Sequence, residues 1–367
     1  MSSCSFLAHR IPGPKGYVRS VFSHARGPAE VHYYPPRSGK LPKDVLIFVP
    51  GNPGLVDYYI PFLLKLQSHI APHFALLAHS HIGHSPSLVH PSIPLNLNEQ
   101  IEAKVEFVRC LQAELNEARR AEETEARPVR LGFIGHSVGS EIIVQTMRHL
   151  ERSNRDVKEL SGSAAVSDTS FDITASFLLF PTVSHIAETP NARTLRPIFN
   201  PPLIQLLPLL CIIIQPLIWT LRTVLSILPS TMSFPGLESI YVPNATTLSF
   251  LSSPQTVKSV LHLARSEMST IKAPDLDWYR QQRKRIWSYW GEPDGWVGMQ
   301  GDVVKRVLRG GKGEGERVEG EHEEHAEQLG QVIDCVDNIP HAFCLAHSDA
   351  IADKVAGWIS NAFADRS

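Results

Sequence analysis

The sequence predicts an α/β protein with a mostly parallel central sheet that is flanked by helices. Two observations support this fold class. Strand-like and helix-like segments alternate along the chain, and the runs 44–49 and 129–134 are apolar enough for strands that are buried on both faces. The length of 367 residues, 43% of them hydrophobic, is sufficient for one large core or two modest ones.

The expected elements follow from the pattern of apolar residues in chain order. Short opening strands at 17–22 and 31–34 precede the buried strand 44–49, a helix over 57–69 and a strand at 74–78. A long helix at 97–120 leads to the strand 129–134 and the helix 138–150, and the Ser-, Asp- and Thr-rich segment 154–172 is expected to be a surface loop. The remaining strands are expected at 177–180, 286–290 and 332–336, and a helix at 348–363 closes the chain.

Two segments interrupt this alternation and suggest how the chain is organised. Residues 182–280 are expected to be a helical, apolar insertion that forms a lid between two parts of one core, 1–181 and 281–367. The Glu- and Gly-rich stretch 310–330 contains too few apolar residues to fold, so we expect a disordered surface loop there.

Composition excludes several classes of function. The net charge is −2 and basic residues form no block, so nucleic-acid binding is not expected. The five cysteines lack metal-ligand spacing, and their odd number without a disulfide framework fits a reducing compartment. No metal or cofactor is predicted.

No signal-peptide pattern begins the chain, and its last four residues match no targeting signal, so we expect a protein on the cytosolic side.

The segment Gly135-His136-Ser137-Val138-Gly139 matches the pattern G-x-S-x-G between a buried strand and an amphipathic helix. In the α/β-hydrolase fold this sharp strand-to-helix turn presents a nucleophilic serine, and its glycines provide room for a strained backbone. We therefore predict that Ser137 is the nucleophile, against the alternative of a turn serine without chemistry. His136 is expected to pack under the turn rather than to titrate.

A nucleophilic serine needs a base and an acid that orients the base, and in this fold they follow in the order Ser, Asp or Glu, His. Asp294 lies directly after the predicted strand 286–290, with Glu292 as the substitute. His341 follows the last predicted strand and is favoured as the base. His347 competes with it, although it lies closer to the final helix and is suited to flanking the first turn of that helix.

An oxyanion hole requires two backbone N–H groups. One is expected from Val138, the residue after the nucleophile, and the other from the turn that follows the strand 44–49. Pro50 and Pro53 in that turn have no N–H, so Asn52 is the favoured donor and Gly51 the second choice. Together these groups predict that His341 deprotonates Ser137, which attacks an acyl carbonyl, and that water later hydrolyses the acyl-enzyme.

The insertion contains an apolar run that is long enough to reach across a bilayer, because residues 197–221 include no charged side chain. Pro208, Pro216, Gln205 and Gln215 divide the run, so two kinked helices in an interface, or a shallow hairpin, fit better than a straight span. We favour contact of the region 201–229 with a membrane or lipid surface. The alternative is a lid that packs only on the substrate cleft.

Several of these motifs together resemble the lipid droplet-associated hydrolase family, a branch of the α/β-hydrolases, over about residues 44–360. The matching segments are 48–54 with the following Tyr58 and Tyr59, 79–85, 135–139, 291–297 and 339–343. The resemblance implies a serine hydrolase of lipid droplets and the endoplasmic reticulum that acts on sterol esters or acylglycerols, with Ser137, Asp294 and His341 as the triad. It also implies that the apolar insertion targets the chain to droplets.

Two other functions remain open from the sequence. One is a droplet-organising protein whose hydrolase activity is weak or vestigial. The other is a soluble hydrolase of small esters whose insertion is only a lid. The insert 310–330 departs from the family's compact pattern and lengthens the separation between the predicted acid and base.

Overall fold

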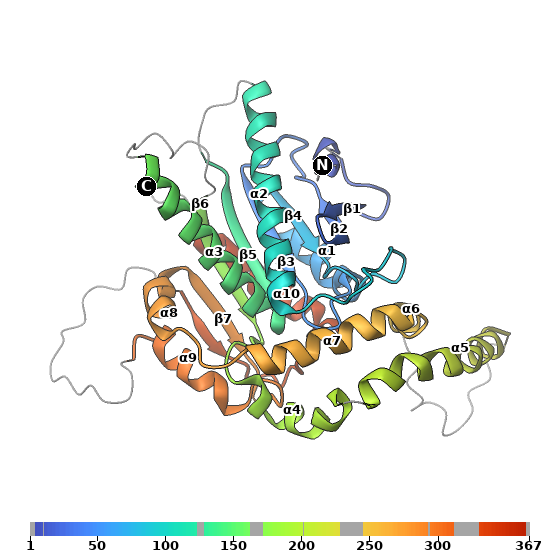
Figure 1. The fold of residues 1–367 in the computed structure, drawn as a ribbon. Coiled ribbons are helices and arrows are strands. Elements are labelled where there is room, and N and C mark those ends of the chain that lie inside the picture. The colour runs from blue at the N-terminus through green and yellow to red at the C-terminus, as the bar shows by residue number, and fades with distance from the viewer. Residues whose placement is uncertain are drawn as a thin grey trace.

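The structure is a computed structural model that describes residues 4–9, 11–122, 128–161, 172–200, 202–227, 245–292, 294–311 and 330–364. An eight-stranded sheet in the order β1-β2-β4-β3-β5-β6-β7-β8 runs through its centre (Figure 1). The strands β1 and β2 form an antiparallel hairpin that pairs antiparallel with β4, and every later pairing is parallel. The eight strands are Val18–His24, Gly27–Tyr34, Asp44–Val49, Phe74–His79, Arg130–His136, Asp172–Leu179, Ile286–Trp290 and Val332–Asp334.

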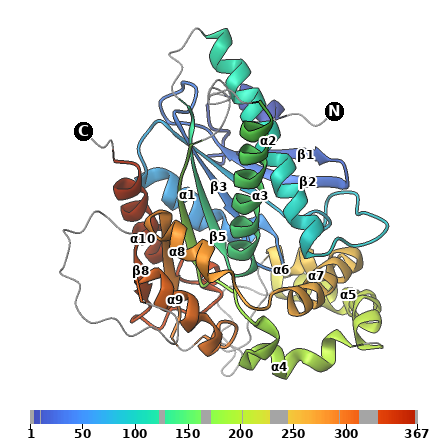
Figure 2. The ribbon, with the colours of Figure 1, turned by 60° about the vertical axis from the view of Figure 1, so that its left-hand side comes forward.

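Helices cover both faces of the sheet, and this confirms the predicted α/β architecture. Helices α2 (Leu97–Ala121) and α3 (Val138–Ser161) pack against each other on one face, whereas α1 (Ile60–His69) and α10 (Ser348–Ala362) pack together on the other (Figure 2). Alternate residues of the buried strands point to opposite faces. Val45 and Ile47 therefore belong to the core under α2 and α3, while Leu46 and Phe48 belong to the core under α1 and α10.

The predicted surface loop at 154–172 begins too early, and the strand after it begins before its predicted start. Helix α3 continues to Ser161, and β6 begins at Asp172, five residues before the predicted strand. Arg, Lys, Glu and Leu in 155–160 favour helix, and this preference outweighs the Ser and Asp residues that suggested a loop. Residues 162–171 lie outside the described part of the chain, as do residues 312–329, which make up most of the insert that we expected to be disordered.

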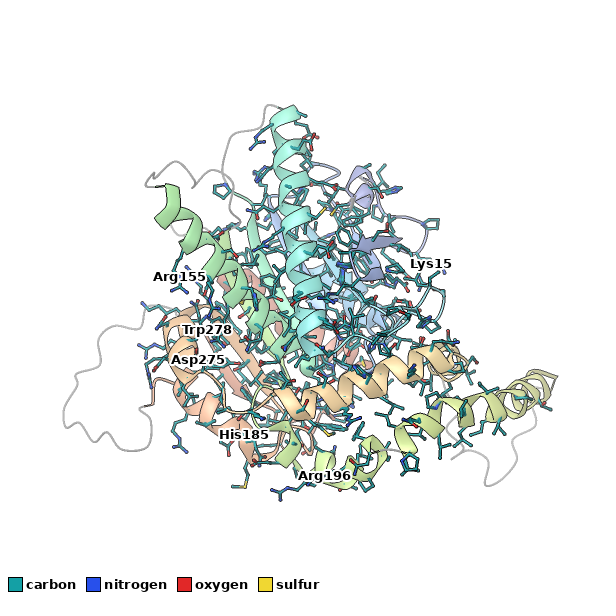
Figure 3. All side chains as sticks on the ribbon, viewed as in Figure 1. Lys15, Arg155, His185, Arg196, Asp275 and Trp278 are labelled. Carbon is teal, nitrogen blue, oxygen red and sulfur yellow. The ribbon has the colours of Figure 1, made fainter. Side chains whose placement is uncertain are left out.

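The insertion forms a layer of helices across the carboxyl edge of the sheet (Figure 1). Helix α7 (Pro254–Thr270) packs along α5 (Leu203–Ile227), and the shorter helices are α4 (Pro190–Leu195), α6 (Ala245–Leu251) and α8 (Leu276–Gln282). Asp275 and Trp278, at the end of the insertion, lie beside α3 (Figure 3). Arg148 pairs with Asp275 at 2.7 Å and the Trp278 indole donates to Glu151 at 3.1 Å, so these contacts fasten the insertion to the core.

The expected break at Pro208 and Pro216 is also wrong, because both prolines lie inside the continuous helix α5. Each proline removes one backbone donor, and its fixed φ is compatible with a helix. The Thr220 hydroxyl donates to the Pro216 carbonyl at 2.6 Å, within the same helix. The sharp bend comes earlier, where 190–199 and 203–214 meet at 79°. In the described residues, no single helix has the length and apolar content to cross a membrane, although this bent pair meets those criteria jointly.

The short helix α9 (Asp302–Leu308) completes the core beside β7 and β8. Its Lys305 ammonium lies 2.9 Å from Asp302 and 3.4 Å from Asp334, at the end of β8. These contacts connect the segment after β7 to the last strand, so the two loops that follow β7 and β8 are held next to each other at the carboxyl edge of the sheet.

Candidate active site

The turn between β5 and α3 holds Ser137 at the carboxyl edge of the sheet, as the sequence predicted. Ser137 has a φ of 54°, a left-handed conformation that costs a non-glycine residue energy and that the surroundings must stabilise. Its N–H donates to the Leu179 carbonyl at 2.9 Å. A Cβ on Gly139 would lie 2.2 Å from the Val49 carbonyl oxygen, so this position requires glycine.

The structure brings Ser137, Asp294 and His341 into one hydrogen-bonded row. His341 Nδ1 lies 2.7 Å from Asp294 Oδ2, and His341 Nε2 lies 2.9 Å from Ser137 Oγ. Because an ionised carboxylate can only accept, Nδ1 donates and Nε2 is left to accept the serine proton. Asp294 Oδ1 accepts from the Trp296 N–H at 2.9 Å and the Val297 N–H at 3.3 Å, which orients the carboxylate.

The two competing residues lie elsewhere. The Glu292 side chain is 66% exposed and lies 3.5 Å from the Lys305 ammonium. His347 occupies the N-cap position of α10, where its own N–H donates to the Phe343 carbonyl at 2.7 Å. The geometry therefore places Asp294 and His341, rather than Glu292 and His347, at Ser137.

The turn after β3 lies against Ser137 and leaves one suitable amide free. A Cβ on Gly51 would be only 2.8 Å from Ser137 Cβ, and the Gly51 N–H already donates to the Tyr59 hydroxyl at 3.2 Å. Within the described part of the chain, the amides of Asn52 and Val138 make no hydrogen bond. The Gly51 amide is thus occupied, whereas the Asn52 and Val138 amides remain available in the described residues.

His136 and Tyr59 connect this turn to the histidine of the row. His136 Nε2 lies 2.8 Å from the His341 carbonyl oxygen, which can only accept, so Nε2 carries the proton. Burial lowers the pKa of His136 well below its ordinary value, which keeps the ring neutral. Its Nδ1 therefore accepts from the Tyr59 hydroxyl at 2.7 Å. Sequence reasoning assigned no role to Tyr59, since nothing local indicates which residue its hydroxyl would reach.

Replacing Tyr59 with phenylalanine is expected to lower both stability and turnover. The change leaves the Gly51 N–H and His136 Nδ1 without their partner, and an unsatisfied buried polar group costs about 1–3 kcal/mol. Urea unfolding and steady-state ester hydrolysis would measure the two effects. The control is Tyr58→Phe, because the Tyr58 hydroxyl bonds to Thr247 in the insertion. Equal effects of the two substitutions would contradict the role given to Tyr59.

Two groups of potential metal ligands occur in the described residues, and neither includes a member of the row. Glu30, His32 and Asp57 form one group, but Arg19 already pairs with both of its carboxylates. The other group consists of Cys4, Cys110 and Glu114. Burial raises the pKa of both thiols, which disfavours the thiolate form that binds metals. The expected absence of a metal remains a prediction.

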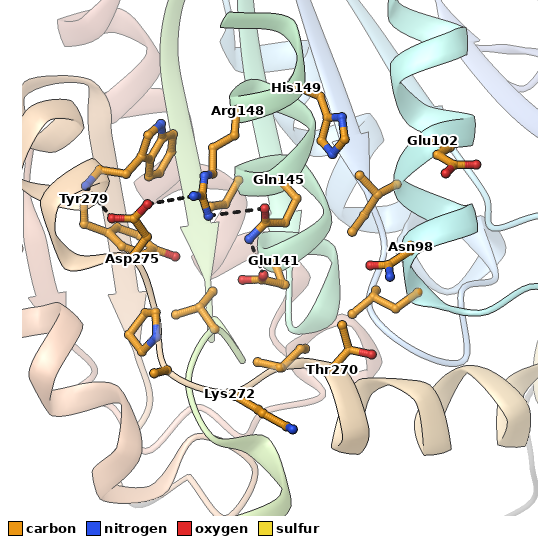
Figure 4. A pocket seen from close by; sticks show the side chains of 18 residues that line it. Asn98, Glu102, Glu141, Gln145, Arg148, His149, Thr270, Lys272, Asp275 and Tyr279 are labelled. Carbon is orange, nitrogen blue, oxygen red and sulfur yellow. Dashed lines mark hydrogen bonds and ion pairs between the residues drawn. The ribbon is translucent and has the colours of Figure 1, made fainter. Parts of the chain in front are cut away.

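A cavity of about 650 Å³ lies between α2, α3 and the segment 270–279 (Figure 4). Glu141 lies at its wall, and burial raises the pKa of this carboxyl to about 7. The Gln145 amide donates to Glu141 at 2.7 Å, and Arg148 is paired with Asp275 (Figure 4). None of Ser137, Asp294 and His341 lines this cavity, so it is separate from the hydrogen-bonded row.

Comparison with known proteins finds one family over most of the chain. A family model described as lipid-droplet associated hydrolase matches residues 42–344. A relative from Rattus norvegicus named lipid droplet-associated hydrolase is 26% identical over 335 residues, covering 87% of this chain and 86% of the relative.

Among solved structures, a bacterial membrane phospholipase A aligns with a TM-score of 0.56 at 12% identity, over 95% of this chain and 87% of that one. A haloalkane dehalogenase from Bradyrhizobium elkanii aligns with a TM-score of 0.53 at 12% identity, over 94% and 97%. At such low identity these structures establish the shared α/β-hydrolase fold alone.

Proposed function

The chain belongs to the lipid droplet-associated hydrolase family, and from this premise we propose that it is a serine esterase that cleaves ester lipids at the surface of lipid droplets. The observation that carries the proposal is the hydrogen-bonded row from Ser137 through His341 to Asp294, beside two amides that make no hydrogen bond to the described residues. A nucleophile, a base, an acid that orients the base and an oxyanion site are the groups that acyl transfer requires.

In the proposed reaction, His341 Nε2 accepts the Ser137 hydroxyl proton while Oγ attacks the ester carbonyl carbon. The carbonyl π electrons move onto oxygen, and the N–H groups of Val138 and Asn52 stabilise that charge. The tetrahedral intermediate collapses, the ester C–O bond breaks, and His341 protonates the departing alcohol. His341 then deprotonates a water molecule, which hydrolyses the acyl-enzyme to release the acid and restore Ser137. Asp294 holds the required tautomer of His341 throughout.

The insertion supports a lipid substrate. The first half of helix α5 exposes large apolar side chains, each at least 37% accessible: Leu203, Leu206, Leu209, Leu210, Ile212, Ile213 and Ile214. Contiguous apolar patches of this kind usually mark a protein or membrane contact. We propose that α5, within the region 201–229, contacts the droplet or the cytosolic face of the endoplasmic reticulum. Sterol esters and acylglycerols dissolved in that phase are the proposed substrates.

A panel of substrates tests this function on the purified full-length chain. We expect a fluorophosphonate probe to label the protein. We also expect the protein to hydrolyse both a soluble butyrate ester and emulsions of long-chain cholesteryl and glyceryl esters. Hydrolysis of the soluble ester alone would indicate a small-ester hydrolase. A folded chain that neither labels nor hydrolyses any ester would contradict the proposal and favour a droplet-organising protein with a vestigial site.

A further inference from the structure

The side chain of Asn52 connects the turn after β3, which supplies one of the proposed oxyanion-binding amides, to the helical insertion. Its Nδ2 donates to Glu267 Oε1 at 3.0 Å and to the Val260 carbonyl at 3.0 Å. Glu267 and Val260 both belong to α7, more than 200 positions away along the chain. Both amide protons of Asn52 therefore go to one helix of the insertion, and its backbone N–H is left free for a ligand.

The core holds the residues on either side of Asn52 but not Asn52 itself. The Gly51 N–H donates to Tyr59, and the Pro53 carbonyl accepts from His84 Nδ1 at 2.7 Å. Asn52 has no such contact with the core through its side chain, since Nδ2 bonds only to α7 in the described structure. The orientation of the Asn52 peptide thus depends on α7 as well as on the sheet.

Glu267 is unusual because it places a carboxyl on the buried side of α7. It is 5% exposed, on the same buried side of α7 as Leu263, which is fully buried. Burial raises the pKa of its carboxyl to about 8, and the hydrogen bond with Asn52 opposes this rise. An apolar residue would pack here at lower cost than a carboxyl to which the described residues bring no cation. The contact with Asn52 gives a reason for the carboxyl.

We propose that Glu267 is a positioning residue that orients the oxyanion-binding amide of Asn52 by holding the Asn52 side chain, so that α7 is a working part of the catalytic site. This inference rests on the proposed function. It assigns the insertion a role in chemistry in addition to any contact with lipid. The oxyanion forms only as the reaction proceeds, so loss of the contact should lower kcat more than it changes KM.

The test compares two substitutions of Glu267 on a soluble butyrate ester, so that binding to a lipid surface does not limit the rate. Glu267→Leu removes the acceptor and is expected to lower kcat by about 10- to 100-fold while KM changes less than about 3-fold. Glu267→Gln retains a carbonyl oxygen in the same place and should remain within about 3-fold of wild type. The rate of labelling by a fluorophosphonate should fall in parallel, because the phosphonyl oxygen accepts hydrogen bonds from the same amides.

Asn52→Ala and the double variant complete a cycle. If Glu267 acts through Asn52, the double variant should be no slower than the slower of the two single variants. Ser266→Ala is the matched control, because Ser266 Oγ accepts from the Leu97 N–H at 3.0 Å and joins α7 to the core without touching the turn. Its kcat is expected to equal that of wild type, and thermal unfolding would verify that every variant is folded.

The outcomes separate this inference from the proposed function. Wild-type kcat in folded Glu267→Leu, or an equal loss in Glu267→Gln, would overturn the role of Glu267 while leaving the esterase intact. Multiplicative losses in the double variant would show that the two residues act independently and would also overturn it. A folded wild-type chain that neither hydrolyses esters nor labels would overturn both, since no oxyanion would then form beside Asn52.

Discussion

Replacing Ser137 with alanine is expected to reduce ester hydrolysis by about 10⁴- to 10⁶-fold and to abolish fluorophosphonate labelling, because the attacking oxygen is removed. The row that remains, His341 with Asp294, can still activate water, and the amides of Asn52 and Val138 can still bind an oxyanion. A small residual rate above that of water is therefore expected. The measurements are single-turnover hydrolysis of the soluble ester and in-gel detection of the probe.

The fold of the Ser137→Ala chain should be unchanged. The Ser137 backbone keeps its hydrogen bond to Leu179, and alanine adds no atom to the turn. Ser184→Ala is a suitable control, because Ser184 is another buried serine and its hydroxyl bonds to His185 instead of His341. If the Ser137→Ala chain kept wild-type turnover or labelling while folded, Ser137 could not be the nucleophile.

The parts of the site that follow strands of the sheet were predictable from the sequence. Ser137, Asp294 and His341 come shortly after β5, β7 and β8, and the carboxyl ends of parallel strands meet at one edge of the sheet. Asn52 follows β3 in the same way. The sequence also favoured Asp294 over Glu292. Only the structure shows that Glu292 points to Lys305 and solvent.

The contacts that hold the site together were not predictable, because they depend on how distant segments meet. The fold of the insertion brings Asn52 and Glu267 together. The spacing of apolar residues in the insertion does not indicate which carboxyl will be buried. Local rules failed in the insertion and at the end of α3 for a related reason. The prolines of α5 predicted breaks, and the polar end of α3 predicted a loop, but helix continuation was stronger in both places.

Placing glutamate at three exposed apolar positions of α5 is expected to release the chain from lipid droplets. Leu206, Leu209 and Ile213 are 51%, 55% and 72% exposed and share one side of the helix by their spacing. Burying such a side chain contributes about 1.5–3 kcal/mol, so losing three should weaken partitioning by about 10³-fold or more. Flotation of artificial droplets with the triple variant would measure the bound fraction.

The comparison that isolates α5 is a second triple variant with the same change in charge. Val89, Ile93 and Val336 are 80%, 76% and 85% exposed and lie outside the insertion, so glutamate at these positions should leave droplet binding near the wild-type level. Equal binding by the two triple variants would mean that α5 does not make the contact. If only the α5 variant leaves the droplet and still hydrolyses the soluble ester, the surface that holds the lipid phase and the groups that cleave the ester can be separated. In that case the insertion determines which esters the chain encounters, while the row at Ser137 determines what happens to them.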